Sequence, residues 1–392
     1  MSFVEFSGLS AHFVDRLGVV DSVEWNSLLR PEDSPFLRWE WLDLLESSGS
    51  VTEESGWRPN HLLVRRGSKL AAAAPLYVKR HSEGEFIFDY IWADAARQMG
   101  LPYYPKIIGM SPFTPAAGYR FLTAPGEDSA GLTLSMLMTL EQWAATAGLH
   151  GVAFNFVDPQ WGTILERQGY RRWDHQAFVW ENLDYASFDD YLARFRSQAR
   201  KSIRRERREL AERGIFVRPV AGCDISPDLM RLMHQLYVKT NDKFGIWGCE
   251  YLSGDFFDRI LEKFRDRLVL MTAWEDGDDA APVGMALLVR QADKLWGRYW
   301  GCRREIPFLH FETCLYGPVI WAIEQGIKWF YPGLGGEHKM RRGFVSAPEA
   351  SLHKFFHPTL EALMRTYLPA VNALELEQIE KMNSQLPFAK ND

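Results

Sequence analysis

One local pattern occurs twice in this chain and constrains its fold more than any other feature. In the first half, apolar residues at helical spacing lead to Gly148, and a short apolar run at 152–157 follows. In the second half, a similar helical pattern leads to Gly326 and then to the apolar run 327–331. A glycine after the last apolar position of a helical pattern is typical of a C-terminal cap. Two copies of helix, glycine and strand indicate a duplicated α/β unit.

A second pair of matches and the chain length support the duplication. Gly169-Tyr170 and Gly343-Phe344 recur with nearly the same separation as the two capping glycines. The 392 residues are too many for one ordinary hydrophobic core and suggest two domains of about 150–200 residues each. We therefore expect a first domain at 1–184, a second at 185–370 and a helix end with a tail at 371–392.

Hydrophobic periodicity predicts the same order of elements in both halves, with helices before a hairpin. In the first half we expect helices within 22–49, a hairpin of 61–66 and 70–80, helices over 132–148 and 161–168, and a strand at 177–183. In the second half we expect helices led by Leu229 and by Phe256, a hairpin of 268–275 and 281–291, a strand at 295–300, and a helix from Pro358 to about Met382. The segment 81–128 shows little regular pattern.

The stretch 296–357 combines glycine turns, aromatic residues and ionisable side chains more densely than the rest of the chain. It contains H-F-E-x-C at 310–314, I-E-x-G at 323–326 and P-G-x-x-G-E-H-K-x-x-R-G-F at 332–344. These runs, with the stretches at 34–51 and 103–122, resemble the FemAB-like family of bacterial proteins in the GNAT acyltransferase superfamily. The resemblance implies an α/β protein of two tandem GNAT-like domains, each a mixed, mostly antiparallel sheet flanked by helices.

Acyl transfer to an amine needs a base, a donor for the developing oxyanion and accurate placement of the substrates. The candidates for the base are Glu312, His310 and His338. His310 and Glu312 are two positions apart and do not share a helix face, so only one of them is expected to point into a given cleft. A lone histidine is also commonly a satisfied core residue, and both interpretations stay open.

Candidate substrate-binding residues come from both halves of the chain. Long loops that keep aromatic and charged residues are commonly functional, but 81–128 is equally well described as a merely well-packed insertion. We expect residues 81–126 to form a wall of the cleft. The candidates are Asp89, Trp92, Asp94, Tyr104, Lys106, Thr114 and Arg120 in the first half, and Arg298, Tyr299, Trp300, Glu337, Lys339 and Arg342 in the second.

A strongly basic helix is predicted at 190–213. Between Arg194 and Arg213 stand nine basic and three acidic residues, with no proline or glycine. Two interpretations are open: a solvated helix with Arg–Glu pairs, or a surface that binds phosphates, since arginine forks neutralise a nucleic-acid backbone. The resemblance adds weight to the second, because Fem-type enzymes that use aminoacyl-tRNA carry a basic stretch in the second domain. The candidate nucleic-acid-binding residues are Arg200, Lys201, Arg204, Arg205 and Arg208.

Several other classes of protein are disfavoured. A net charge of −6 argues against whole-surface attraction to nucleic acid or anionic lipid. The four cysteines lack zinc spacing, and no deaminase, P-loop or G-x-S-x-G motif is present. We expect reduced thiols, no metal, no signal peptide, no membrane span and a cytoplasmic location.

These observations lead to an N-acyltransferase that moves an aminoacyl group from aminoacyl-tRNA to an amine of a peptide or small molecule. No separate cofactor is expected, because aminoacyl-tRNA or acyl-CoA is the co-substrate. An acyl-CoA-dependent GNAT enzyme is the alternative, although neither half shows a clean R/Q-x-x-G-x-G/A loop for pyrophosphate. A second alternative is a non-catalytic binding protein with the same fold. The oligomeric state is left open.

Overall fold

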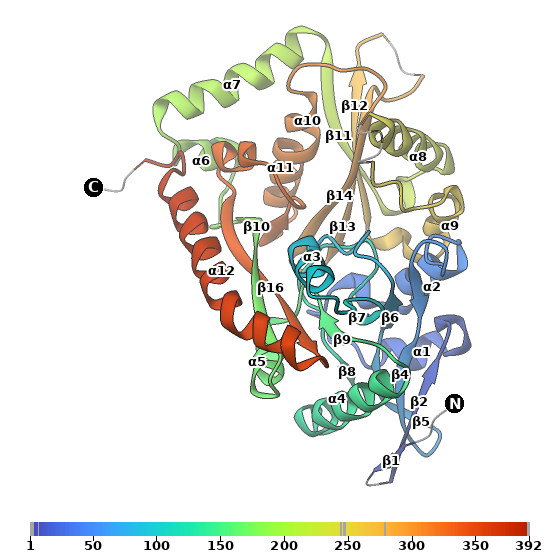
Figure 1. Ribbon diagram of the computed structural model, residues 1–392. Helices are drawn as coiled ribbons and strands as arrows, with labels where there is room; N and C mark the ends of the chain where they lie inside the picture. Colours follow the sequence, from blue (N-terminus) through green and yellow to red (C-terminus); the bar gives the residue numbers. More distant parts are fainter. Residues whose placement is uncertain (1–3, 7, 244, 246–247, 278–279, 390–392) are drawn as a thin grey trace. The chain divides into compact units, whose positions relative to one another are not determined.

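The computed structural model describes residues 4–6, 8–243, 245, 248–277 and 280–389, which form two compact units (Figure 1). Unit 1 comprises Met1–His175 and Glu349–Leu376, and unit 2 comprises Gln176–Pro348 and Glu377–Asp392. Each unit therefore uses two separate stretches of sequence. The last three residues of the predicted tail lie outside the described residues.

Unit 1 contains two sheets. The first has five antiparallel strands in the order β1-β2-β4-β5-β8, and the second has the order β16-β9-β7-β6-β3. Pro75 interrupts the predicted strand at 70–80, so β5 belongs to the first sheet and β6 to the second. The strands of these sheets are β1 (Val4–Phe6), β2 (Leu9–Val14), β3 (Trp57–Pro59), β4 (His61–Arg66), β5 (Lys69–Ala74), β6 (Leu76–Lys79), β7 (Lys106–Gly109), β8 (Leu122–Thr123), β9 (Gly151–Phe154) and the end of β16 (Val345–Phe355).

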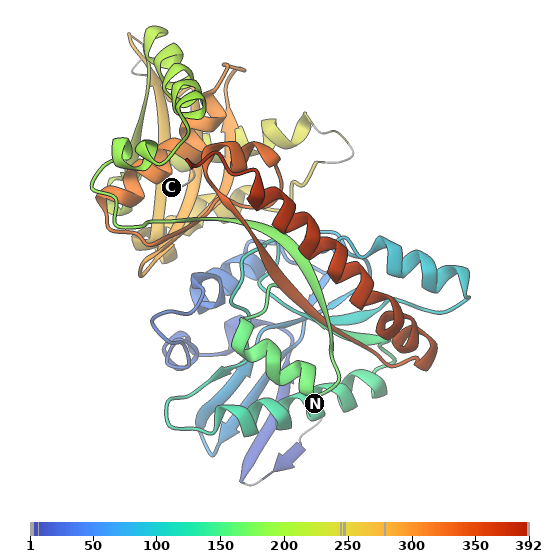
Figure 2. The same ribbon diagram turned by 90° about the vertical axis from the view of Figure 1, so that its left-hand side faces the viewer.

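Several helices of unit 1 begin at capping side chains or prolines that the sequence provides, although α2 and α3 have neither. Asp128 accepts a hydrogen bond from the Gly131 N–H at the start of α4, and Asp158 accepts one from Trp161 with Pro159 in the first turn of α5. These helices are α1 (Ser22–Asn26), α2 (Trp39–Ser47), α3 (Tyr90–Gln98), α4 (Ser129–Thr146), α5 (Pro159–Arg167) and most of α12 (Pro358–Ser384), the long red helix of Figure 2.

Unit 2 is built on one sheet in the order β11-β12-β13-β14-β15-β10, in which only the β14–β15 pair is parallel. Buried apolar residues such as Leu295, Val319 and Phe330 form its core. The strands are β11 (Ile215–Ala221), β12 (Leu268–Glu275), β13 (Gly284–Gln291), β14 (Lys294–Cys302), β15 (Trp329–Tyr331) and the end of β10 (Arg171–Glu181). The helices are α6 (Phe188–Ala193), α7 (Ser197–Glu212), α8 (Pro227–Asp242), α9 (Gly254–Phe264), α10 (Leu309–Phe311), a π-helical turn (Glu312–Tyr316), α11 (Gly317–Glu324) and a 3₁₀ segment (Glu337–Arg342).

The predicted fold class, two GNAT-like α/β halves with mixed sheets, is confirmed. Gly148 and Gly326 both adopt positive φ, 71° and 65°, after their helices. The strand that follows each glycine then pairs in parallel, β9 with β7 and β15 with β14. The duplicated sequence pattern therefore produces the same strand arrangement in both units.

Three secondary-structure predictions need correction. The segment 81–128 contains α3, β7 and β8, which were not predicted because Pro and Gly interrupt its pattern. The basic helix is broken at 194–196 into α6 and α7. The strand β16, eleven residues long, was also not predicted. Among the described residues, no helix combines the length and apolar character needed to cross a membrane.

Candidate functional site

Two parallel strands of unit 2 pair over a short length and then separate. The pairing joins 294–296 of β14 to 329–331 of β15. Beyond these paired residues, β14 continues to Cys302, while the segment that follows β15 turns away at Pro332 and Gly333. Gly333, Gly335 and Gly336 have φ of 89°, 67° and 91°, a region that favours glycine. The space between the diverging segments forms a pocket.

A β-bulge shapes the side of the pocket that β14 provides. Leu287 of β13 faces Tyr299, but the next residue, Leu288, faces Gly297, so Arg298 is the extra residue. A bulge changes the direction of the side chains around it. Arg298, Tyr299 and the following Trp300 consequently all line the pocket.

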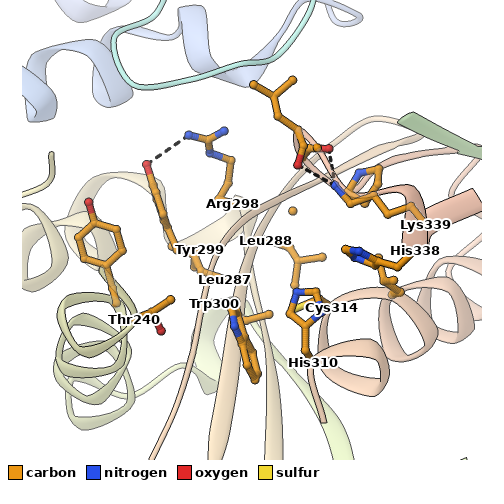
Figure 3. Close-up of a pocket in the computed structure, with 18 of the residues that line it drawn as sticks. Thr240, Leu287, Leu288, Arg298, Tyr299, Trp300, His310, Cys314, His338 and Lys339 are labelled. Carbon is orange, nitrogen blue, oxygen red and sulfur yellow. Dashed lines mark hydrogen bonds between the residues drawn. The ribbon is translucent and has the colours of Figure 1, made fainter. Parts of the chain in front are cut away.

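The pocket has a volume of about 310 Å³ and receives side chains from five segments of unit 2 (Figure 3). These segments are α8, β13, β14, the turn around α10 and the glycine-rich turn with the 3₁₀ segment. Helix α8 packs closely on β14 because position 301 is glycine, where a Cβ would clash with the carbonyl of Leu236. Among the lining side chains are Thr240, Arg298, Trp300, His310, His338 and Lys339.

Two histidines meet in this pocket. The rings of His310 and His338 are 5.6 Å apart, and His310 also lies edge-on to Trp300 at 5.1 Å. Burial, assisted by the charges of His338, Lys339 and Arg342, lowers the pKa of His310 to about 4. Burial and the nearby cations also lower the pKa of His338. Both imidazoles are therefore neutral at pH 7, and the buried Nε2 of His338 makes no hydrogen bond among the described residues.

Lys339 supplies a cation next to the two imidazoles. Its Nζ donates hydrogen bonds to the carbonyl oxygens of Gly333 at 2.8 Å and Leu334 at 2.9 Å (Figure 3). Burial lowers the pKa of Lys339 to about 8. At pH 7 the side chain is still mostly an ammonium group, and its third hydrogen is available to a ligand.

Glu312 and Arg342, two further candidates, do not line the pocket. Glu312 accepts hydrogen bonds from Arg207 of α7 at 3.0 and 3.1 Å. Burial raises the pKa of Glu312, while the charge of Arg207 acts in the opposite direction. Arg342 donates to Glu206 of α7 at 2.8 Å and to the His338 carbonyl at 2.9 Å. As their spacing predicts, His310 points into the pocket and Glu312 does not.

The remaining candidate of this region, Glu337, is exposed beside the pocket rather than part of its lining. Several lining residues were not predicted: Tyr237, Thr240 and Asn241 of α8, Leu287 and Leu288 of β13, and Cys314. Nothing in their local sequence distinguishes them, because tertiary packing brings them to the pocket. Within the described residues, no group of three or more His, Cys, Asp or Glu side chains is arranged to hold a metal ion.

In unit 1, Asp89, Tyr104 and Lys106 belong to one buried cluster. The Lys106 Nζ lies 2.6 Å from Asp89 Oδ2 and 3.1 Å from Glu85 Oε2. The Tyr103 and Tyr104 hydroxyls donate to Asp89 at 2.9 and 3.1 Å. Burial alone lowers the pKa of Lys106, but the two carboxylates raise it well above its usual value. Lys106 therefore faces two carboxylates, and burial raises the pKa of Glu85 to about 7.

The other four candidates of unit 1 are dispersed. Trp92 is buried with its ring 6.0 Å from that of Trp173, and Thr114 is buried and donates to Pro112. Arg120 is buried in a pair with Asp33, and the exposed Asp94 pairs with Arg97 on α3. A role of these side chains in substrate binding stays a prediction.

Most basic residues of α7 lie on its solvent-facing side, whereas Arg207 pairs with Glu312. Arg204 pairs with Asp189 at 2.9 Å, and Arg205 and Arg208 lie 3.7 and 3.6 Å from Glu209 and Glu212. All three arginine side chains are more than half exposed. Arg200 is half-buried and Lys201 exposed, and neither has an ion pair among the described residues. The helix therefore has Arg–Glu pairs and also presents an excess of positive charge.

Comparison with known proteins identifies relatives of the whole fold. The family FemAB-like, described as peptidoglycan biosynthesis/recognition, matches residues 16–390. Similar solved structures include FemX (TM-score 0.54, 12% identity, 88% of this chain and 98% of that chain). A conserved protein of unknown function from Bacteroides thetaiotaomicron has a TM-score of 0.51 at 9% identity, covering 88% and 99% of the two chains. L-PGS from Bacillus licheniformis has a TM-score of 0.49 at 10% identity, covering 84% and 95%.

No curated protein matches the sequence. The family match nevertheless extends over nearly the full length of the chain. FemX and the Bacteroides thetaiotaomicron protein share its fold. The chain therefore belongs to the FemAB-like family.

Proposed function

We propose that this protein transfers an aminoacyl group from aminoacyl-tRNA to an amine of a peptidoglycan-type peptide, and that the pocket of unit 2 is where the transfer occurs. The observation that carries this proposal is the meeting of His310, His338 and Lys339 where β14 and β15 separate. The family description, peptidoglycan biosynthesis/recognition, supports the class of acceptor.

The reaction requires one proton to leave the acceptor and one to reach the donor. The neutral amine nitrogen attacks the ester carbonyl carbon, which forms a C–N bond and a tetrahedral oxyanion. The C–O bond to the tRNA ribose then breaks, the nitrogen loses a proton, and the ribose oxygen gains one. The side chains must therefore provide a base, an acid and a charge near the oxyanion.

His338 and Lys339 suit these roles best. His338 is neutral at pH 7, and its Nε2 is buried without a hydrogen-bond partner in the described part of the chain, so it can accept the proton of the amine. Lys339 carries an ammonium group with a pKa of about 8, which can stabilise the oxyanion or protonate the leaving oxygen. His310, with a pKa near 4, is a weak base and serves better to orient a substrate.

Two features favour tRNA over acyl-CoA as the donor. The exposed arginines of α7 suit a phosphate backbone, which is bound largely by charge. The turn before α10 is a poor place for pyrophosphate, because Pro307 has no N–H and Glu305 adds a carboxylate beside Lys243 at 3.0 Å. Phe308 in this turn has φ of 67°, outside the helical region.

A direct assay separates the donors. Purified protein is incubated with radiolabelled bulk aminoacyl-tRNA or with labelled acetyl-CoA, and with a peptide that carries one free side-chain amine. The matched control is the same peptide with that amine acetylated. We expect label to reach only the free-amine peptide, only from tRNA, and less after ribonuclease treatment. Transfer from acetyl-CoA alone, or RNA binding without any transfer from either donor, would contradict the proposal.

A further inference from the structure

The side of helix α7 that faces the protein contacts two segments that contribute residues to the pocket. Two adjacent residues, Glu206 and Arg207, point away from the exposed arginines and bind two separate pocket-forming segments. Arg207 holds Glu312, which begins the π-helical turn directly after α10. Glu206 holds Arg342, at the end of the 3₁₀ segment that carries His338 and Lys339.

The contact through Glu206 is largely buried and leads to the pocket in two steps. Its side chain is 13% exposed and that of Arg342 is 6% exposed. The Glu206 Oε2 accepts from Arg342 at 2.8 Å and from the Tyr316 hydroxyl at 2.6 Å. Arg342 in turn donates to the backbone carbonyl of His338 and lies with its guanidinium 3.3 Å from the Phe311 ring centroid.

The segment that Arg342 holds is also tied to the preceding turn, since Lys339 Nζ donates to the carbonyls of Gly333 and Leu334, and its end is held by the Tyr191 hydroxyl, which donates to the Arg342 carbonyl. Three glycines with positive φ, at 333, 335 and 336, come directly before His338. Glycine is the least restricted residue, so this turn does not by itself fix the position of the 3₁₀ segment. The Arg342–Glu206 contact lies at the opposite end and connects the segment to a helix of 16 residues.

We propose that Glu206 is a positioning residue: through Arg342 it holds the backbone at His338 and thereby the places of His338 and Lys339 in the pocket. This inference rests on the proposed function for its effect on catalysis, but its effect on the pocket is independent of that function. Helix α7 then has two roles, an outer face for the donor and an inner face that fixes the reacting groups.

The test uses Glu206→Gln, which keeps the size of the side chain and removes its charge. The matched control is Glu212→Gln, which removes the same charge from the exposed side of the same helix. Cys314 lines the pocket, and burial raises the pKa of its thiol, so it reacts slowly with N-ethylmaleimide unless the pocket changes. Its rate of modification is followed by peptide mass spectrometry. All rates are measured well below the melting temperature of each variant.

For Glu206→Gln we expect a several-fold change in the Cys314 modification rate and unchanged tRNA affinity. In the transfer assay kcat should fall about 10- to 100-fold with KM nearly unchanged, since displacement of a reacting group by about 1 Å costs up to that much. Glu212→Gln should change neither the Cys314 modification rate nor kcat. A lower melting temperature with unchanged Cys314 modification would show a merely structural role and overturn the inference. If the wild-type protein transfers nothing, the proposed function fails, and the Cys314 rates still decide this inference.

Discussion

Both units place ionisable side chains next to a parallel strand pair, β7–β9 in unit 1 and β14–β15 in unit 2. The partners of the buried lysine differ between the two units. In unit 1, Lys106 on β7 is 1% exposed and is paired with Glu85 and Asp89. In unit 2, Lys339 lies beside two histidines, and its hydrogen bonds go to backbone carbonyls. No carboxylate is among the described residues that line its pocket.

We interpret this difference as that between a structural cluster and the proposed reactive one. In the first, Lys106 pairs with two buried carboxylates, and the tyrosine hydroxyls donate hydrogen bonds to Asp89. In the second, one cation and two neutral imidazoles share a pocket that is open to a ligand, and burial shifts the pKa of each. Perturbed groups in a concave site are the arrangement that catalysis uses. The comparison predicts that changes in unit 1 affect stability and changes in unit 2 affect activity.

The largest effect is expected for Lys106→Met. It leaves Glu85 and Asp89 buried without their cation, and breaking a buried pair in this way costs about 3–5 kcal/mol. Denaturant unfolding measures the loss. The control Lys69→Met removes an exposed lysine of β5 and should change stability by less than about 0.5 kcal/mol. Equal stabilities for the two variants would remove the distinction between the units.

His338→Gln should have the opposite effect to Lys106→Met: it should reduce activity and leave stability nearly unchanged. Loss of a positioned base reduces the transfer rate by about 100-fold or more, while stability changes little. The control His234→Gln changes a histidine of α8 that stacks on Phe257 outside the pocket lining, and it should retain activity. Steady-state transfer and thermal unfolding are measured on both variants. A His338→Gln protein that is fully active but unstable would assign this histidine to the structural class.

The rate should also depend on pH through Lys339. Its pKa of about 8 means that the ammonium form is lost as the pH rises through that value. The neutral fraction of the acceptor amine also rises with pH, but this change is the same for every variant and cancels in a ratio of rates. In Lys339→Arg the guanidinium stays charged, so if the ammonium is required, the ratio of the wild-type rate to the Lys339→Arg rate should fall about tenfold for each unit above pH 8. A ratio that is constant from pH 7 to 10 would exclude the protonated lysine.

The smallest effect is expected from the surface of α7. Replacing Arg204, Arg205 and Arg208 by alanine removes up to three phosphate contacts and should reduce the salt dependence of tRNA binding by about two units in the log–log slope. Stability should hardly change, because exposed ion pairs contribute about 0–1 kcal/mol. Filter binding over a salt series measures the slope, with Arg290→Ala, an exposed arginine of β13, as the control. An unchanged slope would leave α7 as a solvated helix.

Local sequence patterns predicted the fold class and some of the residues that line the pocket. The two capping glycines indicated a duplicated helix-and-strand unit, and the motif at 332–344 contained His338 and Lys339. Spacing also indicated that His310 and Glu312 point in different directions. These inferences succeeded because each depends on residues that are close in sequence.

The remaining parts of the site depend on packing between distant segments. Tyr237 and Thr240 reach the pocket because Gly301 allows α8 to approach β14, and nothing near them in sequence indicates this. The same holds for Asp89 and Lys106, whose burial against each other is visible only in three dimensions. A charged residue in a loop looks the same in the sequence whether it binds a substrate or another side chain.

The most direct test of the central claim is a single-turnover transfer assay with Lys339→Met. Enzyme in excess over labelled aminoacyl-tRNA is mixed with the free-amine peptide, and tRNA affinity is measured on the same samples. We predict wild-type tRNA affinity with a transfer rate lowered by about 100- to 1,000-fold, as for loss of one oxyanion donor. Transfer at the wild-type rate by Lys339→Met would show that the reaction does not take place in the pocket of unit 2.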